Sequence, residues 1–223
     1  MKVGIIQSNF LPWRGYFDFI REVDLFILHD DLQYTKGDWR NRNKIKTSRG
    51  VEWITVPVKY PHMSQLIEET AVDYSMAWAQ KMLNRIRESY RRAPCFEPYF
   101  SELTELLMTP SASISDLNLR LIQWVCSRLK IHTTIHMSRE YQPQGAKTER
   151  LIGILRKAGA TTYLSGPAAQ AYLIPEMFES AGIKLEYKKY HYPEYEQLYP
   201  PFDPYVTILD LLFMTGPEAI NFL

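Results

Sequence analysis

The 223-residue sequence has little cysteine, little glycine and almost no net charge. Its two cysteines, Cys95 and Cys126, lie far apart and form no CxxC motif, which argues against a disulfide framework and a cysteine-based zinc site. Lys and Arg number 26 against 25 Asp and Glu, so a formal charge of +1 gives no general attraction for nucleic acid. No apolar run approaches the roughly 20 residues that a membrane-spanning helix needs. We therefore expect a cytoplasmic protein with no nucleic-acid partner and no membrane span.

The sequence does contain enough apolar residues for a packed core. Hydrophobic residues make up 46% of the chain and aromatic residues 13%, as in an ordinary globular protein. No linker divides the sequence, so we expect a single α/β domain over residues 1–223. Within it we expect a helical insertion at about 60–115, and a wrapping loop followed by a helix at about 191–223.

Short β-type runs alternate with amphipathic helical runs along most of the chain. This order predicts a Rossmann-like α/β fold, with a mostly parallel sheet and flanking helices. The strands are expected at 3–7, 25–29, 52–58, 131–137, 161–164 and 183–190, and the main helices at 16–23, 75–92, 99–108, 115–129, 148–158 and 175–181.

The loop after the first expected strand, QSNFLPWRGYF, is dense in polar and aromatic groups. Ligands of open α/β sheets bind at the carboxyl ends of strands, so this loop is a candidate binding segment. An alternative is a rigid loop in which Trp13 only packs. The candidate substrate-binding residues here are Gln7, Asn9, Trp13 and Tyr16.

Asp30, Asp31, Gln33 and Tyr34 follow the second expected strand. If the first two strands are neighbours, their loops face one crevice. His29, Asp30 and Asp31 could hold a divalent cation, but adjacent residues of an extended chain point apart, so we assign no metal site. Asp30 or Asp31 is a more plausible general base, or a carboxylate that orients an amine, and Gln33 and Tyr34 are candidate substrate-binding residues.

The segment after these aspartates is locally cationic. Residues 36–49 contain six basic side chains against one acidic side chain, Asp38. If the chain is extended here, four cations share one face: Arg40, Arg42, Lys44 and Lys46. Such a face suits a phosphate or a carboxylate, and Arg40, Asn41 and Arg42 are candidate substrate-binding residues. A solvated edge strand is the alternative.

Two later segments add candidates. Ser165 follows the strand expected at 161–164, where it either binds a ligand or caps the next helix. In the loop HYPEYEQLYPPFDPY, Tyr195 and Gln197 are candidate substrate-binding groups that could close over a pocket. His191 is a candidate acid or base, although a lone histidine more often satisfies a local hydrogen bond.

These motifs, in order and spacing, resemble the WbqC-like bacterial proteins. The resemblance covers nearly the whole chain, through IIQSNFLPWRGYFDFI, HDDLQYTKGDWRNRNKIK, WITVPV, GATTYLSGPAAQAYL, YHYPEYEQL and PYVTILDLLF. It implies a role in making surface polysaccharides or specialised metabolites, with attachment of an acyl or aminoacyl group to an amino sugar among the proposed activities.

A more distant similarity links the N-terminal layout to pantothenate synthetase and other nucleotidylyltransferase-fold enzymes. By that analogy Trp13 and Tyr16 stand where the family has two histidines, and Gln33 stands where it has a substrate-binding glutamine. Because those two histidines are absent, the analogy implies a Rossmann-like crevice at this place and not adenylation by the usual route.

The leading hypothesis is a transferase that forms an amide on an amino sugar or a similar amine. Its partner would be an anionic small molecule, either a nucleotide sugar or an acyl thioester. The alternatives are an ATP-dependent carboxylate–amine ligase, or a nucleotidylyltransferase-like enzyme, and a non-catalytic binding protein of a biosynthetic complex. No cofactor or oligomeric state is assigned.

Overall fold

The computed structural model describes residues 1–60, 62 and 64–223. The insertion expected at 60–115 includes Pro61 and Met63, which lie outside the described residues. The chain forms two compact units: unit 1 contains residues 1–7, 18–32 and 131–191, and unit 2 contains 8–17, 33–130 and 192–223. The expectation of a single domain with an insertion stays a prediction, and each unit is described by itself.

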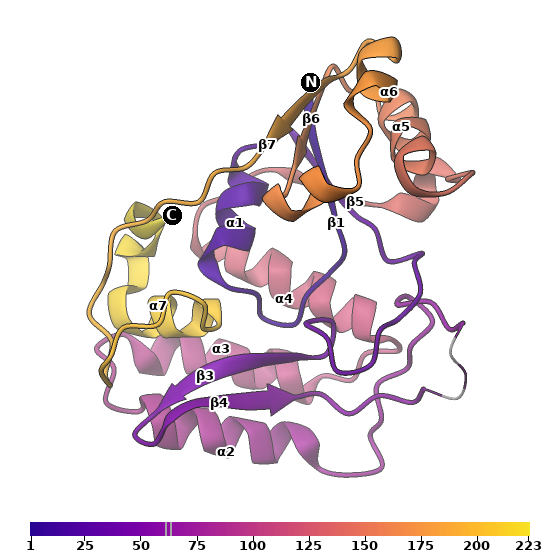
Figure 1. Ribbon diagram of the computed structural model, residues 1–223. Coiled ribbons are helices and arrows are strands. Elements are labelled where there is room, and N and C mark those ends of the chain that lie inside the picture. Colours follow the sequence, from indigo (N-terminus) through magenta and orange to yellow (C-terminus); the bar gives the residue numbers. More distant parts are fainter. Residues whose placement is uncertain (61, 63) are drawn as a thin grey trace. The chain divides into compact units, whose positions relative to one another are not determined.

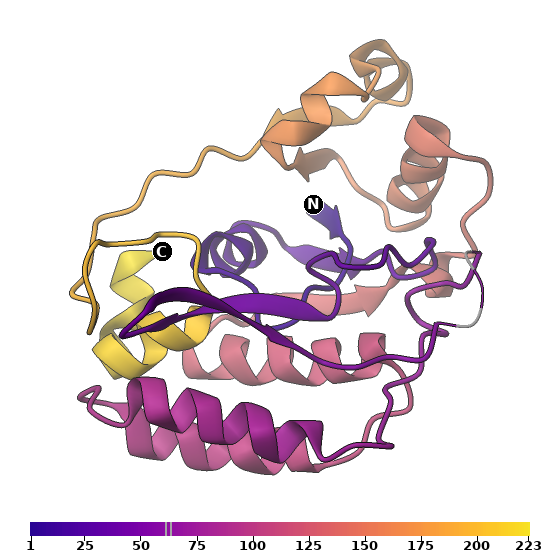
Figure 2. The same ribbon diagram turned by 60° about the horizontal axis from the view of Figure 1, so that its bottom comes forward.

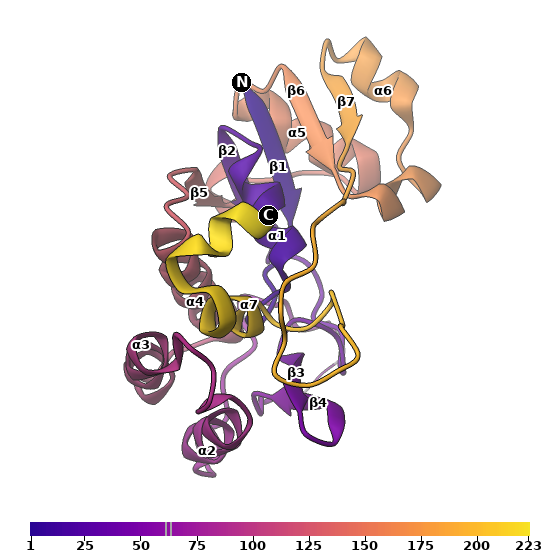
Figure 3. The same cartoon turned by 90° about the vertical axis from the view of Figure 1, so that its left-hand side faces the viewer.

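Unit 1 is built on a five-stranded sheet in which every pairing is parallel. Figure 3 shows the strands side by side in the order β5, β2, β1, β6, β7. The predicted Rossmann-like α/β class is confirmed. The strands are β1 (Lys2–Ile6), β2 (Leu25–Leu28), β5 (Thr134–Met137), β6 (Thr162–Ser165) and β7 (Lys184–Tyr187).

The order of the strands creates a switch point at β1. The chain runs outward from β1 to β2 and β5, then returns to the other side of β1 as β6 and continues to β7. In sheets wound in two directions from a central strand, loops on the two sides of the switch point separate and leave room for a ligand. This topology puts the expected crevice of unit 1 between the ends of β1 and β6.

On one face of the sheet of unit 1, alternate side chains of the strands pack against helices. Val3 and Ile5 of β1, and Ile27 of β2, belong to a buried cluster that also contains residues of α5 (Lys147–Lys157) and α6 (Pro175–Ser180). Figure 1 shows α5 and α6 beside β6 and β7. The LFIL run of β2 is buried throughout, as expected of a strand covered on both faces. Short 3₁₀ helices, η1 (Ser138–Tyr141) and η2 (Pro167–Ala171), complete the unit.

The opposite face of β1 lies close to the second half of α1 (Arg14–Arg21), a helix that runs from unit 2 into unit 1. Phe19 packs edge-on to Phe26 of β2, with ring centroids 6.0 Å apart. A Cβ atom added at Gly4 would overlap the Phe19 ring. Glycine at this position therefore permits the close approach of the helix to the sheet.

Unit 2 combines an antiparallel hairpin with helices. The hairpin pairs β3 (Arg42–Thr47) with β4 (Gly50–Thr55). The strand expected at 52–58 ends before Pro57, which has no N–H to donate to a ladder. Figure 2 shows α2 and α3 side by side. The helices are α2 (Trp78–Tyr90), α3 (Phe96–Met108), α4 (Ile114–Arg128), α7 (Ile208–Thr215) and the 3₁₀ helix η3 (Gly216–Phe222).

Helix α4 shows how the sequence specifies this unit. Ser113 accepts a hydrogen bond from the Asp116 amide at 3.1 Å, and Asp116 accepts one from the Ser113 amide at 3.2 Å. This capping box satisfies two amides at the start of the helix. The apolar side chains at three- and four-residue spacing, from Ile114 to Leu129, are buried as the spacing predicts.

Among the described residues, no helix is long and apolar enough to cross a membrane.

Two glycine variants of unit 1 test the packing of β1. We expect Gly4→Ala to lower the free energy of unfolding by about 1–3 kcal/mol, because the new methyl group must displace the Phe19 ring. Gly153→Ala in α5 is the matched control, since a Cβ there meets nothing within 4 Å and alanine favours the helix, giving a gain of up to about 1 kcal/mol. Urea denaturation measures both, and equal stabilities for the two variants would contradict this packing.

Candidate functional site

A cavity of about 350 Å³ lies at the carboxyl edge of the sheet of unit 1. Its walls come from the ends of β1, β2 and β6, from the start of α5 and from η2. It therefore occupies the switch point of the sheet, where the order of the strands predicts a ligand site. Its polar and charged lining residues are Gln7, His29, Lys147, Arg150, Tyr163, Ser165 and Tyr172.

An ion pair supports one wall of this cavity. Arg150 Nη2 and Ser138 Oγ both donate hydrogen bonds to the carboxylate of Asp31. Arg150 Nε donates to Nε2 of His29 at 3.3 Å, and its Nη1 donates to the Pro143 carbonyl at 3.3 Å. Three partners thus hold the guanidinium in one position. A cation fixed in this way can meet an anionic ligand without first losing side-chain entropy.

His29 is a neutral imidazole at pH 7. Burial lowers its pKa from 6.5 to about 4; the nearby Asp31 carboxylate opposes this shift and the Arg150 guanidinium adds to it. The 3.6 Å approach of His29 Nε2 to Asp31 is accordingly not an ion pair. Because Nε2 accepts a hydrogen bond from Arg150, we assign the ring proton to Nδ1. The histidine therefore offers a neutral N–H donor.

The small-residue turn after β6 forms another part of the lining. Ser165 is buried, and its Oγ donates to the hydroxyl of Tyr163 at 3.4 Å. Burial raises the pKa of Tyr163 well above its usual value, so its hydroxyl stays protonated. A Cβ added at Gly166 meets nothing within 4 Å, which shows open space at the turn.

The structure brings some of the predicted site residues of unit 1 to this cavity and leaves others away from it. The five residues are Gln7, Asp30, Asp31, Ser165 and His191. Gln7 and Ser165 line the cavity, as their places at strand ends predict. Asp31 contacts two residues that line the cavity, Arg150 and His29. Asp30 is completely buried. His191 is exposed and is absent from the lining of this cavity. The proposed chemical roles of these five residues stay predictions.

Sequence reasoning missed Lys147 and Arg150 and did not place His29 in a cavity. The two basic side chains lie in the first turn of α5, where the helix dipole disfavours cations. That unfavourable placement was a usable signal. Their closeness to the end of β2 could not be predicted from local pattern, because residues 29–146 lie between the two elements in the sequence.

In unit 2, Asn9 and Trp13 line a second cavity of about 380 Å³. Its other lining residues are Pro12, Trp39, Asn43, Lys44 and Tyr205. The Trp13 ring lies 5.4 Å from Tyr205, centroid to centroid. This cavity is thus rich in aromatic rings and contains one cation.

The predicted cationic face of residues 40–46 is divided by the structure. Arg40 lies in a turn before β3 and donates to the Ser8 carbonyl at 2.9 Å and to Asn9 Oδ1 at 2.6 Å. Asn41 is buried and donates to the Val56 carbonyl at 2.7 Å. The Arg42 guanidinium instead lies over the ring of Trp53. Internal hydrogen bonds therefore engage Arg40 and Asn41, which leaves Arg42 as the best placed of the three for a ligand.

Three further predicted residues of unit 2 are not among the described residues that line this second cavity. Tyr16 is buried and packs edge-on to Phe17. Tyr34 is also buried, and burial raises its pKa to about 12. Gln33 is exposed and forms an isolated β-bridge with Leu66. Their ligand-binding roles stay predictions.

Tyr195 and Gln197 take part in a buried polar network of unit 2. Asp210 accepts hydrogen bonds from Tyr195 at 2.8 Å and from Tyr90 at 2.9 Å. Gln197 accepts a hydrogen bond from Lys46 Nζ at 2.9 Å and donates to the hydroxyl of Tyr195 at 3.2 Å. Burial raises the pKa of Asp210, and these donors oppose the shift. The contacts give both predicted residues a structural role, while their binding role stays a prediction.

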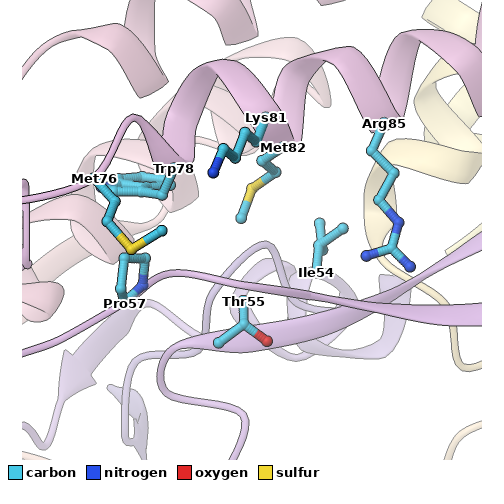
Figure 4. Close-up of a pocket in the computed structure, with 8 residues that line it drawn as sticks. All are labelled: Ile54, Thr55, Pro57, Met76, Trp78, Lys81, Met82 and Arg85. Carbon is cyan, nitrogen blue, oxygen red and sulfur yellow. The ribbon is translucent and has the colours of Figure 1, made fainter.

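A third cavity, of about 320 Å³, lies between β4 and α2 in unit 2. Figure 4 shows Met76, Trp78 and Met82 on the helix side, facing Ile54 and Pro57. Its lining is largely apolar, with two basic side chains, Lys81 and Arg85. The described residues that line it include no acidic side chain, so they do not supply the paired acid and base groups that chemistry on an amine requires.

No group of three or more metal-binding side chains occurs in the described part of the chain. At the place where His29, Asp30 and Asp31 were considered for a cation, the structure puts the guanidinium of Arg150 beside His29 and Asp31.

The buried histidine makes the stability of the protein depend on pH. Because its pKa is about 4 in the native state and 6.5 in the unfolded chain, the unfolded state binds more protons between these values. The contribution is present above pH 6.5 and is lost as the pH falls toward 4, by on the order of 1–3 kcal/mol. We expect the urea midpoint to fall less between pH 7.5 and 4.5 in His29→Asn than in the parent protein. Equal pH dependence in the two proteins would refute this.

The polar network predicts a second stability effect. Tyr195→Phe removes one donor from the buried carboxylate of Asp210 and should cost about 1–3 kcal/mol of unfolding free energy. Tyr205→Phe is the control, because that side chain is 61% exposed and should change stability by less than about 0.5 kcal/mol. Urea denaturation compares the variants, and a neutral Tyr195→Phe would argue against the network.

Comparisons with known proteins show similarity over nearly the whole chain. The model of the WbqC-like protein family matches residues 7–222. A protein of Mycobacterium tuberculosis (strain ATCC 25618 / H37Rv) that bears the name Uncharacterized protein Rv1507c is 44% identical over 225 residues, which cover 100% of this chain and 97% of that protein. No solved structure gives a significant match. The family match and this relative confirm the resemblance seen in the motifs: the chain belongs to the WbqC-like protein family.

Proposed function

We propose that this protein is a transferase that forms an amide on an amino sugar or a similar amine. The acyl or aminoacyl group would arrive as an activated ester or a thioester, in the synthesis of a bacterial surface polysaccharide or a specialised metabolite. The observation that carries the proposal is the cavity at the switch point of unit 1, where a fixed guanidinium, a neutral imidazole and a carboxylate meet.

The lining of the cavity suits one anionic and one polar substrate group. Lys147 and Arg150 would bind the anionic part of a donor or acceptor, since both cations line the cavity. Gln7 and Ser165 would position the acceptor through their amide and hydroxyl groups.

The reaction itself requires placement and one proton transfer. The lone pair of the amine attacks the acyl carbon, and the bond from that carbon to the leaving oxygen or sulfur breaks. Asp31 would take the proton that the amine loses, and the Nδ1–H of His29 would donate to the carbonyl oxygen as negative charge develops there. Holding both reactants in one cavity lowers the entropic part of the barrier. Asp30 and His191 remain proposed as additional orienting groups.

Amide formation tests the assignment directly. We would incubate the protein with a set of acyl-coenzyme A thioesters and nucleotide-linked amino sugars, and detect the amide by mass spectrometry. Asp31→Asn and Arg150→Gln should each lower kcat/KM by about 100-fold or more, as expected for the loss of a base or of a substrate-holding cation. Arg156→Gln is the matched control, because that arginine is exposed in the last turn of the same helix.

The outcomes separate the competing functions. Full turnover in both Asp31→Asn and Arg150→Gln would contradict the assigned site. ATP-dependent pyrophosphate exchange without transfer from thioesters would favour a ligase. Tight binding without turnover for any donor and acceptor pair would favour a binding protein, and a thermal shift reports such binding because a ligand of the native state raises stability.

A further inference from the structure

In unit 2, two cations and one indole ring of the hairpin of β3 and β4 lie beside a second indole ring, that of Trp39 in the turn before β3. The guanidinium carbon of Arg42 lies 4.2 Å from the ring centroid of Trp53. Lys44 Nζ lies 5.4 Å from the Trp53 centroid and 5.9 Å from that of Trp39. The two indoles are 5.1 Å apart, centroid to centroid, and each tryptophan is 38% exposed. Exposed tryptophans that neighbour one another are costly to keep in water and point to a ligand.

The cations of this group are short of anionic partners. The buried Nε of Arg42 has no hydrogen-bond partner among the described residues. No carboxylate of the described residues forms an ion pair with Arg42 or Lys44. By contrast, Nη2 of Arg40 lies 3.5 Å from Oδ2 of Asp38. Arg42 and Lys44 project from the same face of β3, since alternate residues of a strand do so. An anion with two charged oxygens or phosphates fits such a pair.

The adjoining cavity offers a place for a flat ring. Trp13, Trp39 and Tyr205 give it aromatic walls, and Lys44 belongs both to this lining and to the cationic pair. Asn9 accepts a hydrogen bond from Arg40 through its Oδ1, which orients the side-chain amide and leaves its NH₂ group as a donor. The volume of about 380 Å³ is within the range of small-molecule sites. Aromatic walls favour a planar heteroaromatic ring by stacking.

We propose that this cavity and the pair Arg42 and Lys44 bind a nucleoside diphosphate group, with the base in the cavity and the phosphates on the two cations. The binding site rests only on residues of unit 2. Its use in amide transfer rests on the proposed function, because a nucleotide sugar and a coenzyme A thioester both carry a nucleoside diphosphate group.

Tryptophan fluorescence titration tests the proposal in the full-length protein. The probes are UDP, ADP, coenzyme A, uridine, inorganic pyrophosphate and neutral N-acetylglucosamine. We expect UDP or ADP to quench the fluorescence and to bind at least 10-fold more tightly than uridine or pyrophosphate alone. Preference for UDP or for ADP over coenzyme A would identify a nucleotide sugar as the source of the group, and preference for coenzyme A over ADP would identify a thioester.

Matched variants locate the binding. Arg42→Gln and Lys44→Gln should each weaken binding of the preferred nucleotide at least 10-fold, and Arg42→Lys should restore part of the loss because it keeps the charge. Arg49→Gln is the control on the same hairpin, since Arg49 faces Glu52 at 3.2 Å and should leave the affinity unchanged. Circular dichroism confirms that each variant is folded before titration.

Three results would overturn the inference. These are no binding of any nucleotide, equal affinity for pyrophosphate alone, and tighter binding of the neutral sugar than of UDP and ADP. Arg150→Gln separates this site from the proposed reaction, because it should lower kcat/KM for amide transfer about 100-fold or more and leave nucleotide binding at the hairpin intact. Loss of nucleotide binding in that variant would place the nucleotide in unit 1 and contradict the proposal.

Discussion

The parallel pairing of β1 with both β2 and β6 is the constraint on which the candidate site depends. Parallel strands end at the same edge of a sheet, so residues distant in sequence meet there when their strands pair. The register pairs Ile6 with Leu28 and Gly4 with Leu164, which brings the segments after the three strands to a common edge. The chain then departs in opposite directions along the sheet from β1, and the cavity forms at this switch point.

Three buried or half-buried charged side chains, Arg150, Asp210 and Arg42, differ in the partners that surround them. Arg150 in unit 1 is held by a carboxylate, an imidazole and a carbonyl, so its position is fixed before a substrate arrives. In unit 2, Asp210 is enclosed by hydroxyl donors that stabilise the fold rather than face a ligand. Arg42 rests on an indole ring with a buried nitrogen unsatisfied within the described chain. The satisfied network around Asp210 specifies structure, whereas the unsatisfied Nε of Arg42 is a candidate for binding.

Several features of the site could be predicted from local pattern. Gln7 and Ser165 were expected at strand ends because short apolar runs precede them, and both line the cavity of unit 1. Arg40 and Asn41 show the limit of such reasoning. An alternating run of basic and amide residues looks like one binding face, yet the turn before β3 directs Arg40 to the Ser8 carbonyl and Asn41 to that of Val56. Arg42 and Lys44 are half-buried and keep the alternate spacing that the pattern suggested, whereas Lys46 is buried.

The sequence by itself determined the α/β class, the positions of most strands and helices and the family, because hydrophobic period and helix-end signals act over a few residues. The tertiary structure alone decided that Arg150 contacts His29 and Asp31, and that Tyr195 donates a hydrogen bond to Asp210. It also decided that the rings of Trp39 and Trp53 lie beside the cations of β3. These contacts join segments separated by many residues. Strand order and side-chain packing, which no local pattern encodes, determine which of those segments meet.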